Sequence, residues 1–356
     1  MDTELIFTNH VADAIDNAVA TLKPSDVFVL ADVNTTHYAL PILKSMSTAI
    51  ANAKIITCLA GDLNKNLDQL AKVWNALIAG QASRTALLIN LGGGAVTDLG
   101  GLAAATFKRG MKTINVPTTL LGAVDAAVGG KTAINYGGVK NMIGVFNKPD
   151  MVIISTMFFN SLPLQEMLSG YAEMIKHGLL KSKTTLADLL AYDITVPHNS
   201  DNRLLGLIRE SVLIKEDIVR QDPTEKGLRR TLNLGHTVGH AFEALAMKRL
   251  SPIPHGYAVA WGIVVELVLS NMLKQFDSAT LHKVAQYIRQ SYGAFDITCD
   301  DYDQLLAYMR QDKKNLDTSH INFTLLRAVG DPVINITATD DQITAALDIY
   351  RDLMGI

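Results

Sequence analysis

Two histidines and a glutamate at helical spacing are the clearest candidates for chemistry in this sequence. His236 and His240 are four residues apart and Glu243 follows three residues later, so a helix would project all three from one face. A third histidine, His255, stands where a further helix could begin. Imidazole nitrogens and carboxylate oxygens are common ligands of divalent metals. Spacing alone therefore favours a metal site made by the three histidines, with ordinary core or surface histidines as the alternative.

A second polar group precedes these histidines in the sequence GYAEMIKHG. Glu173, Lys176 and His177 would lie on one helix. A carboxylate followed by a lysine three residues later is typical either of a functional site or of a surface ion pair. Periodicity does not decide between the two.

Glycines 92–94 lie directly after an apolar run and directly before a helical pattern. The N–H groups and the dipole at the start of a helix can hold a phosphate or pyrophosphate. Against the G-x-G-x-x-G fingerprint the sixth position is Thr97, so a dinucleotide site and a plain tight turn both stay open. Asp32 and Asn34 follow another apolar run, where Asp32 could accept hydrogen bonds from the ribose of NAD or could cap a helix.

The segment 116–144 is rich in glycine and carries several charged side chains. It is not a P-loop, because the first glycine of that motif is absent. Lysines beside glycines nevertheless indicate recognition of an anion. The residues concerned are Asp125, Gly129, Gly130, Lys131, Lys140 and Asn141.

Two kinds of periodicity indicate what positions these residues. Up to about residue 155, β-rich runs at 26–32, 54–62, 85–94, 112–119 and 150–156 alternate with helical patterns at 67–80 and 95–108, which predicts a parallel sheet covered on both faces. Beyond residue 160, apolar residues recur at helical spacing over 163–181, 202–221, 258–275, 278–292 and 301–312, with one strand-like run at 320–330. We therefore predict an α/β domain over 1–160 and a mostly helical domain over 161–356, with Ser161 capping a helix that has Pro163 just inside.

Composition excludes several classes of protein. The chain has 356 residues, of which 48% are hydrophobic, enough to fill two cores. A net charge of −3 lacks the basic excess of a general nucleic-acid or membrane-surface binder. No stretch free of charged residues reaches the ~20 apolar residues that cross a bilayer, and the N-terminus lacks the pattern of a secretory signal. Two cysteines cannot build a Cys-rich metal site, so we expect a cytoplasmic protein whose metal ligands are His, Asp or Glu.

Seven motifs in order resemble the 3-dehydroquinate synthase family. They are GGGAVTDLGG, VPTTLLGAVDAAVGGKTAIN, KNMIG, GYAEMIKHG, LNLGHTVGHAFE, HGYAVAWG and DKKN, and the match runs from about Asp32 to Asn315. The resemblance implies a Rossmann-like NAD-binding domain, an all-α metal-binding domain and a substrate site between them. It also implies Zn²⁺ or Co²⁺ as the metal and a homodimer.

The resemblance assigns roles residue by residue. The metal ligands would be Glu173, His236 and His255, so that Glu173 replaces the His240 favoured by spacing. Residues that match substrate contacts are Asp125, Lys131, Asn141, Lys176, Lys215, Arg229, Asn233, His240 and Lys313 or Lys314, with Arg109 reaching the phosphate from the partner subunit. Residues that match NAD contacts are Asp32, Asn34, Asp62, Lys65, Gly93, Gly94, Asp98, Thr118, Thr119, Lys140, Ser161, Leu162 and Glu166. Asp62 stands where the family often has Glu, and Tyr257 replaces the Glu of its HGE motif.

The implied reaction converts 3-deoxy-D-arabino-heptulosonate 7-phosphate to 3-dehydroquinate and phosphate, with NAD used catalytically, in the shikimate pathway to aromatic amino acids. A sibling sugar-phosphate cyclase is the nearest alternative, but Arg229, Asn233 and His240 favour the heptulosonate. A metal-dependent polyol or glycerol-phosphate dehydrogenase would instead release NADH. A non-catalytic binding protein is disfavoured because the charged set is costly to bury without a ligand.

Overall fold

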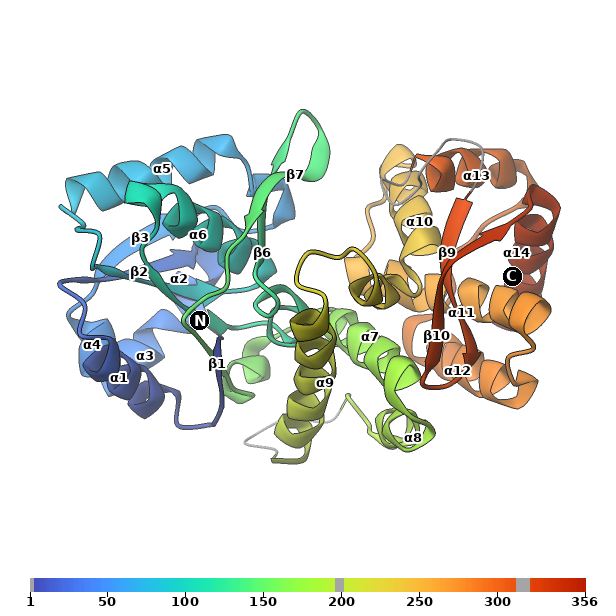
Figure 1. The fold of residues 1–356 in the computed structure, drawn as a ribbon, viewed down its shortest axis with the longest axis horizontal. Coiled ribbons are helices and arrows are strands. Elements are labelled where there is room, and N and C mark those ends of the chain that lie inside the picture. Colours follow the sequence, from blue (N-terminus) through green and yellow to red (C-terminus); the bar gives the residue numbers. More distant parts are fainter. Residues whose placement is uncertain (1–2, 196–201, 312–320) are drawn as a thin grey trace. The chain divides into compact units, whose positions relative to one another are not determined.

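The chain forms two compact units. The structure, a computed structural model, describes residues 3–195, 202–311 and 321–356 (Figure 1). Unit 1 comprises Met1–Pro163 and Val196–Glu216, and unit 2 comprises Leu164–Thr195 and Asp217–Ile356. The sequence-based division into 1–160 and 161–356 does not include the return of 196–216 to unit 1.

Unit 1 is built on a parallel six-stranded sheet. The strands, in spatial order, are β1 (Glu4–Phe7), β8 (Met151–Ile154), β5 (Lys112–Pro117), β4 (Leu87–Gly92), β2 (Val27–Asp32) and β3 (Lys54–Cys58). Helices α1 (Val11–Leu22), α3 (Leu40–Met46) and α4 (Thr48–Ala51) cover one face, and α5 (Leu67–Ala79) and α6 (Gly94–Thr106) cover the other (Figure 1). Burial on both faces explains why β4 is apolar along almost its whole length.

The predicted α/β fold of unit 1 is confirmed, with two additions. All the β-rich runs named from the sequence form strands of the sheet, whereas β1 at its edge was not predicted. The glycine-rich segment also forms an antiparallel hairpin of β6 (Lys131–Tyr136) and β7 (Val139–Phe146). Its turn consists of Gly137 and Gly138 with φ of +59° and +79°, a conformation that favours two glycines.

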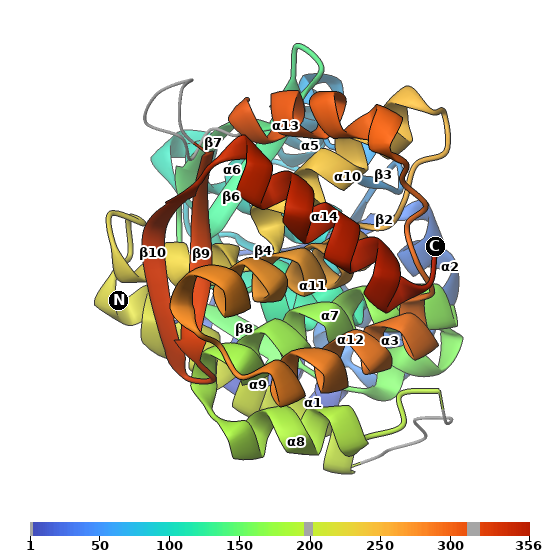
Figure 2. The same ribbon diagram turned by 90° about the vertical axis from the view of Figure 1, so that its right-hand side faces the viewer.

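Unit 2 is mainly helical, as predicted. Its helices are α7 (Leu164–Lys181), α8 (Lys183–Ala191), α10 (His236–Lys248), α11 (His255–Lys274), α12 (Ser278–Tyr292), α13 (Tyr302–Arg310) and α14 (Asp340–Met354), while α9 (Asn202–Gln221) begins in unit 1 and ends in unit 2. The strand-like run forms β9 (Ile321–Ala328), which pairs with β10 (Asp331–Ala338), a strand that was not predicted. Figure 2 shows this hairpin beside α11, which contacts β9.

The predicted helix cap at Ser161 is wrong. Ser161 lies in a 3-10 turn, Met157–Ser161, and its hydroxyl donates to the Phe158 carbonyl at 3.1 Å. Helix α7 begins only at Leu164. A serine hydroxyl can bond back within a turn as readily as it can cap a following helix, and the sequence does not distinguish these partners.

Helix α11 is the central helix of unit 2. It packs against α7, α10, α12, α14 and β9. Within the described ranges it is also a helix long and apolar enough to cross a membrane by length and composition, but 78% of its most apolar window is buried inside the protein. A helix that is apolar on all sides and covered by neighbours is a core helix.

Glycines permit an unusually close approach of α10 and α11. A Cβ on Gly262 would lie 2.0 Å from the Gly235 carbonyl oxygen and 2.8 Å from the Gly239 nitrogen. Gly235 itself has a φ of +81°, the left-handed conformation that favours glycine. The backbones of the two helices are therefore in contact at this crossing.

We predict that Gly262→Ala destabilises unit 2 by at least about 2 kcal/mol, because the added methyl group must push α10 and α11 apart. Thermal unfolding monitored by circular dichroism would measure the loss. The matched control is Gly206→Ala in α9, where a Cβ would meet nothing within 4 Å. This control should be neutral or slightly stabilising through its better helix propensity, and equal melting temperatures for the two variants would contradict the close packing.

Candidate functional site

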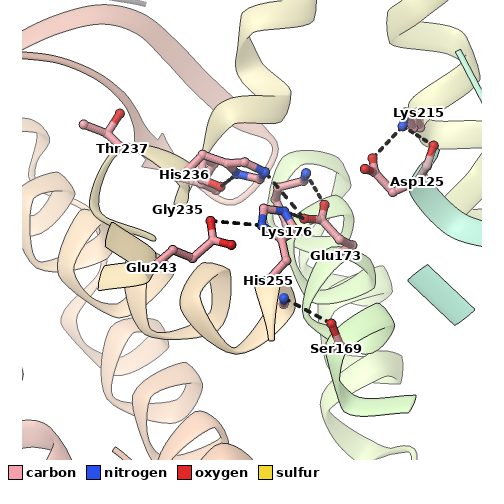
Figure 3. Close-up of polar contacts among 12 residues, drawn as sticks. Asp125, Ser169, Glu173, Lys176, Lys215, Gly235, His236, Thr237, Glu243 and His255 are labelled. Carbon is pink, nitrogen blue, oxygen red and sulfur yellow. Dashed lines mark hydrogen bonds and ion pairs between the residues drawn. The ribbon is translucent and has the colours of Figure 1, made fainter. Parts of the chain in front are cut away.

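Three side chains from three helices of unit 2 converge on one point. Figure 3 shows Glu173 of α7, His236 at the start of α10 and His255 at the start of α11 pointing toward one another. The Nε2 atoms of His236 and His255 lie 3.5 Å and 3.7 Å from Oε1 of Glu173. One ligand atom from each residue falls within 4.8 Å of the others. The arrangement is a two-histidine, one-carboxylate donor set.

The second nitrogen of each imidazole has an acceptor that fixes the tautomer. Nδ1 of His236 lies 3.1 Å from the Leu234 carbonyl oxygen, and Nδ1 of His255 lies 3.4 Å from Oε2 of Glu243. A carbonyl or carboxylate oxygen only accepts, so each Nδ1 carries a proton, and in the neutral imidazole each Nε2 keeps its lone pair. Both lone pairs are thereby available on the side of Glu173.

The Glu173 carboxylate is completely buried. Lys176, one helical turn later and also buried, forms an ion pair with its Oε2. Neither oxygen of Glu173 accepts a hydrogen bond from the described part of the chain. A buried carboxylate is costly unless cations surround it, and the two imidazole lone pairs cannot serve as donors to it. The donor set fits a divalent metal such as Zn²⁺.

His240 lies beside this cluster without completing it. Its ring centroid is 5.5 Å from that of His236 and 6.2 Å from that of His255. It belongs to a second possible group of ligands, with Glu243 and His255. The three histidines favoured by spacing are thus close together, but His240 and Glu173 compete for the third position.

In unit 1, the glycine run joins β4 to α6. Gly93 is the residue before the first turn of α6, and no side chain of the described residues caps that turn. A Cβ on Gly93 would lie 3.1 Å from the Thr119 side chain, and one on Gly94 would lie 2.9 Å from the Ala126 side chain. The N–H of Thr118 donates to the Gly92 carbonyl. A helix N-terminus that lacks a side-chain cap is suited to a pyrophosphate.

A buried lysine ties together several predicted nucleotide residues. Nζ of Lys65 donates to Asp98 at 2.6 Å and to Oδ1 of Asn141 at 2.7 Å, and lies 3.3 Å from Asp62. Lys140 lies 3.8 Å from the other oxygen of Asp62. Asn141, which the resemblance assigns to the substrate, therefore joins residues assigned to NAD.

Buried Lys215 and partly buried Asp125 form a second ion pair in unit 1. Nζ of Lys215, on α9, donates to both the carbonyl and the carboxylate of Asp125 at 2.5 Å. Asp125 lies in a single π-helical turn, Gly122–Ala126, a deviation from the α-helix that is frequent at functional sites. The glycine-rich segment therefore directs the carboxylate of Asp125 to the ammonium group of Lys215.

The loop before α10 holds two further predicted residues. Arg229 is buried, and its Nη1 donates to the Pro223 carbonyl at 2.8 Å. Asn233 donates to Oε1 of Glu225 at 3.2 Å. Asp222 supports the loop, because hydrogen bonds from backbone N–H groups, that of Gly227 first, hold the pKa of its carboxyl below the usual value.

The remaining predicted residues lie in turns or at the ends of helices and strands. Asp32 caps α2 (Val33–Tyr38) by accepting the Thr35 N–H at 2.7 Å, the alternative role considered for it, and Asn34 is exposed. Lys131 is exposed at the start of β6, Leu162 ends the turn before α7, and Glu166 lies in the first turn of α7. Arg109 is exposed on a turn in which Lys108 and Arg109 both have positive φ. Lys313 and Lys314 lie outside the described residues.

Several supporting residues were not predicted from the sequence. Glu243 was noted only as sharing a helix face, and neither Glu225 nor Ser169 was considered, although Ser169 accepts the Gly256 N–H at 3.1 Å. A Cβ on Gly256 would lie 1.9 Å from the Ser169 carbonyl oxygen, so α11 begins in backbone contact with α7. The Gly after His255 is a signal that could have indicated this contact.

We predict that Asp98 titrates near pH 6. Burial raises the pKa of this carboxyl from 3.8 to about 6, and the Lys65 ammonium opposes the shift. The pKa is higher in the folded state, so folding takes up a proton between pH 3.8 and about 6. The free energy of unfolding therefore falls as the pH rises through this window. The ¹³C resonance of the carboxyl, identified by its loss in Asp98→Asn, would give the midpoint. A midpoint near 3.8 would contradict the burial of this charge.

Comparison with known proteins identifies relatives over the whole chain. Residues 55–169 match the model described as 3-dehydroquinate synthase N-terminal, and residues 170–315 match that described as 3-dehydroquinate synthase C-terminal. The chain is 46% identical to a 3-dehydroquinate synthase of Parabacteroides distasonis, over 100% of this chain and 99% of the relative. It is 39% identical to one of Listeria monocytogenes, over 93% and 89% of the two chains.

Solved structures share the fold at lower identity. A 2-epi-5-epi-valiolone synthase from Streptomyces hygroscopicus with NAD⁺ and Zn²⁺ bound has a TM-score of 0.86 at 23% identity, covering 99% of this chain and 97% of that one. A 2-deoxy-scyllo-inosose synthase complexed with carbaglucose-6-phosphate, NAD⁺ and Co²⁺ has a TM-score of 0.80 at 22% identity, covering 96% and 95%. The predicted fold class is confirmed. The two family models and the relative that is 46% identical over the full length agree, and the chain belongs to the 3-dehydroquinate synthase family.

Proposed function

We propose that the protein converts 3-deoxy-D-arabino-heptulosonate 7-phosphate to 3-dehydroquinate and inorganic phosphate. The observation that carries the proposal is the convergence of Glu173, His236 and His255 in a chain whose sequence matches the family over its full length. The reaction cleaves a carbon–oxygen bond with phosphate as the leaving group, so the enzyme is a phosphate lyase. The product and phosphate together contain all atoms of the substrate, and no net oxidation occurs.

NAD and a divalent metal, Zn²⁺ or Co²⁺, are the cofactors of the proposal. Glu173, His236 and His255 would hold the metal. When bound, NAD⁺ supplies a reversible hydride acceptor and the metal lowers the pKa of a coordinated hydroxyl. Two structurally similar synthases that contain NAD⁺ with Zn²⁺ or Co²⁺ support the assignment.

The NAD site of the proposal lies at the carboxyl ends of the strands of unit 1. The N-terminus of α6 would bind the pyrophosphate through the N–H groups that follow Gly93. Lys65 and Asp98 fix each other beside it. The remaining residues proposed for NAD are Asp32, Asn34, Asp62, Gly94, Thr118, Thr119, Lys140, Ser161, Leu162 and Glu166.

Cationic and amide side chains would bind the acid, hydroxyl and phosphate groups of the substrate. Lys176 and Lys215 are buried in ion pairs with Glu173 and Asp125, which orient their ammonium groups. The Pro223 carbonyl likewise holds the guanidinium of Arg229. The other proposed contacts are Lys131, Asn141, Asn233, His240 and Lys313 or Lys314. Asp125 and His240 are the candidates for proton transfer at the ring hydroxyls.

The assembly and compartment of the proposal are a cytoplasmic homodimer. Arg109 is an exposed cation on a turn where two consecutive non-glycine residues have positive φ. A non-glycine residue with positive φ costs conformational energy, and such strain is often kept where a side chain must point in a set direction. The direction proposed for Arg109 is toward the substrate phosphate of the partner subunit.

We predict many turnovers of phosphate release per NAD⁺ when metal-loaded protein is incubated with the heptulosonate phosphate and catalytic NAD⁺. NADH absorbance should stay flat, because the hydride returns to the product. Mass spectrometry would identify 3-dehydroquinate, and protein with Lys176→Met serves as the inactive control. Stoichiometric NADH would instead indicate a dehydrogenase, and NAD and metal binding without phosphate release would indicate a sibling cyclase.

We also predict which substitutions weaken metal binding. His236→Ala, His255→Ala and Glu173→Gln should each lower the affinity for Zn²⁺ by at least about 100-fold, because each removes a ligand. His240→Ala should retain the metal while losing activity. Metal content after dialysis, measured by mass spectrometry, separates the two possible ligand groups. Loss of metal from His240→Ala with retention in Glu173→Gln would show that His240 is the third ligand.

A further inference from the structure

The first turn of α10 lacks a cap of its own. The residue before the helix is Gly235, which has no side chain to accept the N–H groups of that turn. The first N–H groups of a helix have no partner within the helix and are costly to bury unsatisfied. His236, a candidate metal ligand, is the first residue of this helix. Whatever satisfies these N–H groups also fixes the backbone of His236.

A carboxylate from another helix takes the place of the cap. Glu266 of α11 is completely buried. Its Oε2 accepts the Gly235 N–H at 2.6 Å, and its Oε1 accepts the N–H groups of Thr237 at 3.0 Å and Val238 at 3.3 Å. The two oxygens thus hold the backbone on both sides of His236. A negative charge at a helix N-terminus is also favoured by the helix dipole.

Further contacts make this anchor rigid. Gly262, one turn before Glu266, allows the backbone of α11 to contact Gly235. The hydroxyl of Thr237 donates to the Asn322 carbonyl of β9 at 3.1 Å. The Nδ1–H of His236 donates to the carbonyl of Leu234, two residues earlier in the chain. The backbone and the ring of His236 therefore have no independent freedom once Glu266 is in place.

We propose that Glu266 is a positioning residue for the metal ligand His236. This proposal rests on the proposed function, because it takes His236 to be a ligand of the metal. Helix α11 supplies His255 directly and holds His236 through Glu266, so one helix sets the positions of both imidazoles. Glu266 does not touch the metal and acts only through the backbone of α10.

The test is metal affinity and coordination geometry in Glu266→Gln. The amide keeps the shape of the side chain, but it removes the charge and turns one acceptor into a donor facing an N–H group. The Kd for Zn²⁺ would be measured by competition with a chelator, and the geometry by the d–d absorption of the Co²⁺ form. The matched control is Ser270→Ala, one turn later on α11. The buried Ser270 hydroxyl donates to the Glu266 carbonyl and accepts the Leu326 N–H, so its loss removes hydrogen bonds of α11 without changing a contact to α10.

We expect Glu266→Gln to weaken Zn²⁺ binding about 10-fold or more and to alter the Co²⁺ spectrum, as is usual when the support of a ligand is lost. Ser270→Ala should keep the affinity within about twofold, even where its melting temperature falls equally. Wild-type affinity and spectrum in Glu266→Gln would overturn the positioning role. If His236→Ala also binds Zn²⁺ like the wild type, the metal site itself fails, and that result is distinct from a failure of Glu266 alone.

Discussion

The buried charge of Glu173 is the constraint on which the helical unit depends. A carboxylate without contact with water needs cationic neighbours, and here Lys176 pairs with it while two imidazoles turn their Nε2 atoms toward it. These neighbours come from three helices, so the packing of α7, α10 and α11 must be accurate to a fraction of an ångström. Glycines at 235, 256 and 262 provide that accuracy by letting backbones touch. The apolar character of α11 follows from its burial among its neighbours.

Much of the fold could be predicted from the sequence. Strands buried on both faces are continuous apolar runs, and long amphipathic helices repeat every three or four residues, so both have strong local signals. Strands β1, β6, β7 and β10 lacked such signals: β1 is a short edge strand, and the exposed strand β7 gains no core face to reveal its period. The return of 202–216 to unit 1 depends on tertiary contacts that no local pattern encodes.

The candidate site shows the same division. Spacing found His236, His240 and His255, because residues four apart on a helix are neighbours. It could not find Glu173, whose distance in sequence from the histidines conceals its proximity, and only the resemblance to a family indicated it. Glu266 gave no signal at all, since in the sequence it simply interrupts an apolar helix. A lone carboxylate within a buried apolar helix nevertheless needs hydrogen-bond donors, and the N-terminus of another helix can supply them.

The distribution of the donor set over α7, α10 and α11 also bears on the order of folding. Residues 173, 236 and 255 are far apart in the chain, and closing the loops between them costs entropy before any contact between them is gained. The complete donor set therefore exists only after most of the helical unit has collapsed and its helices have packed. Metal uptake during refolding would report this late packing step, whereas circular dichroism would report the earlier formation of the helices.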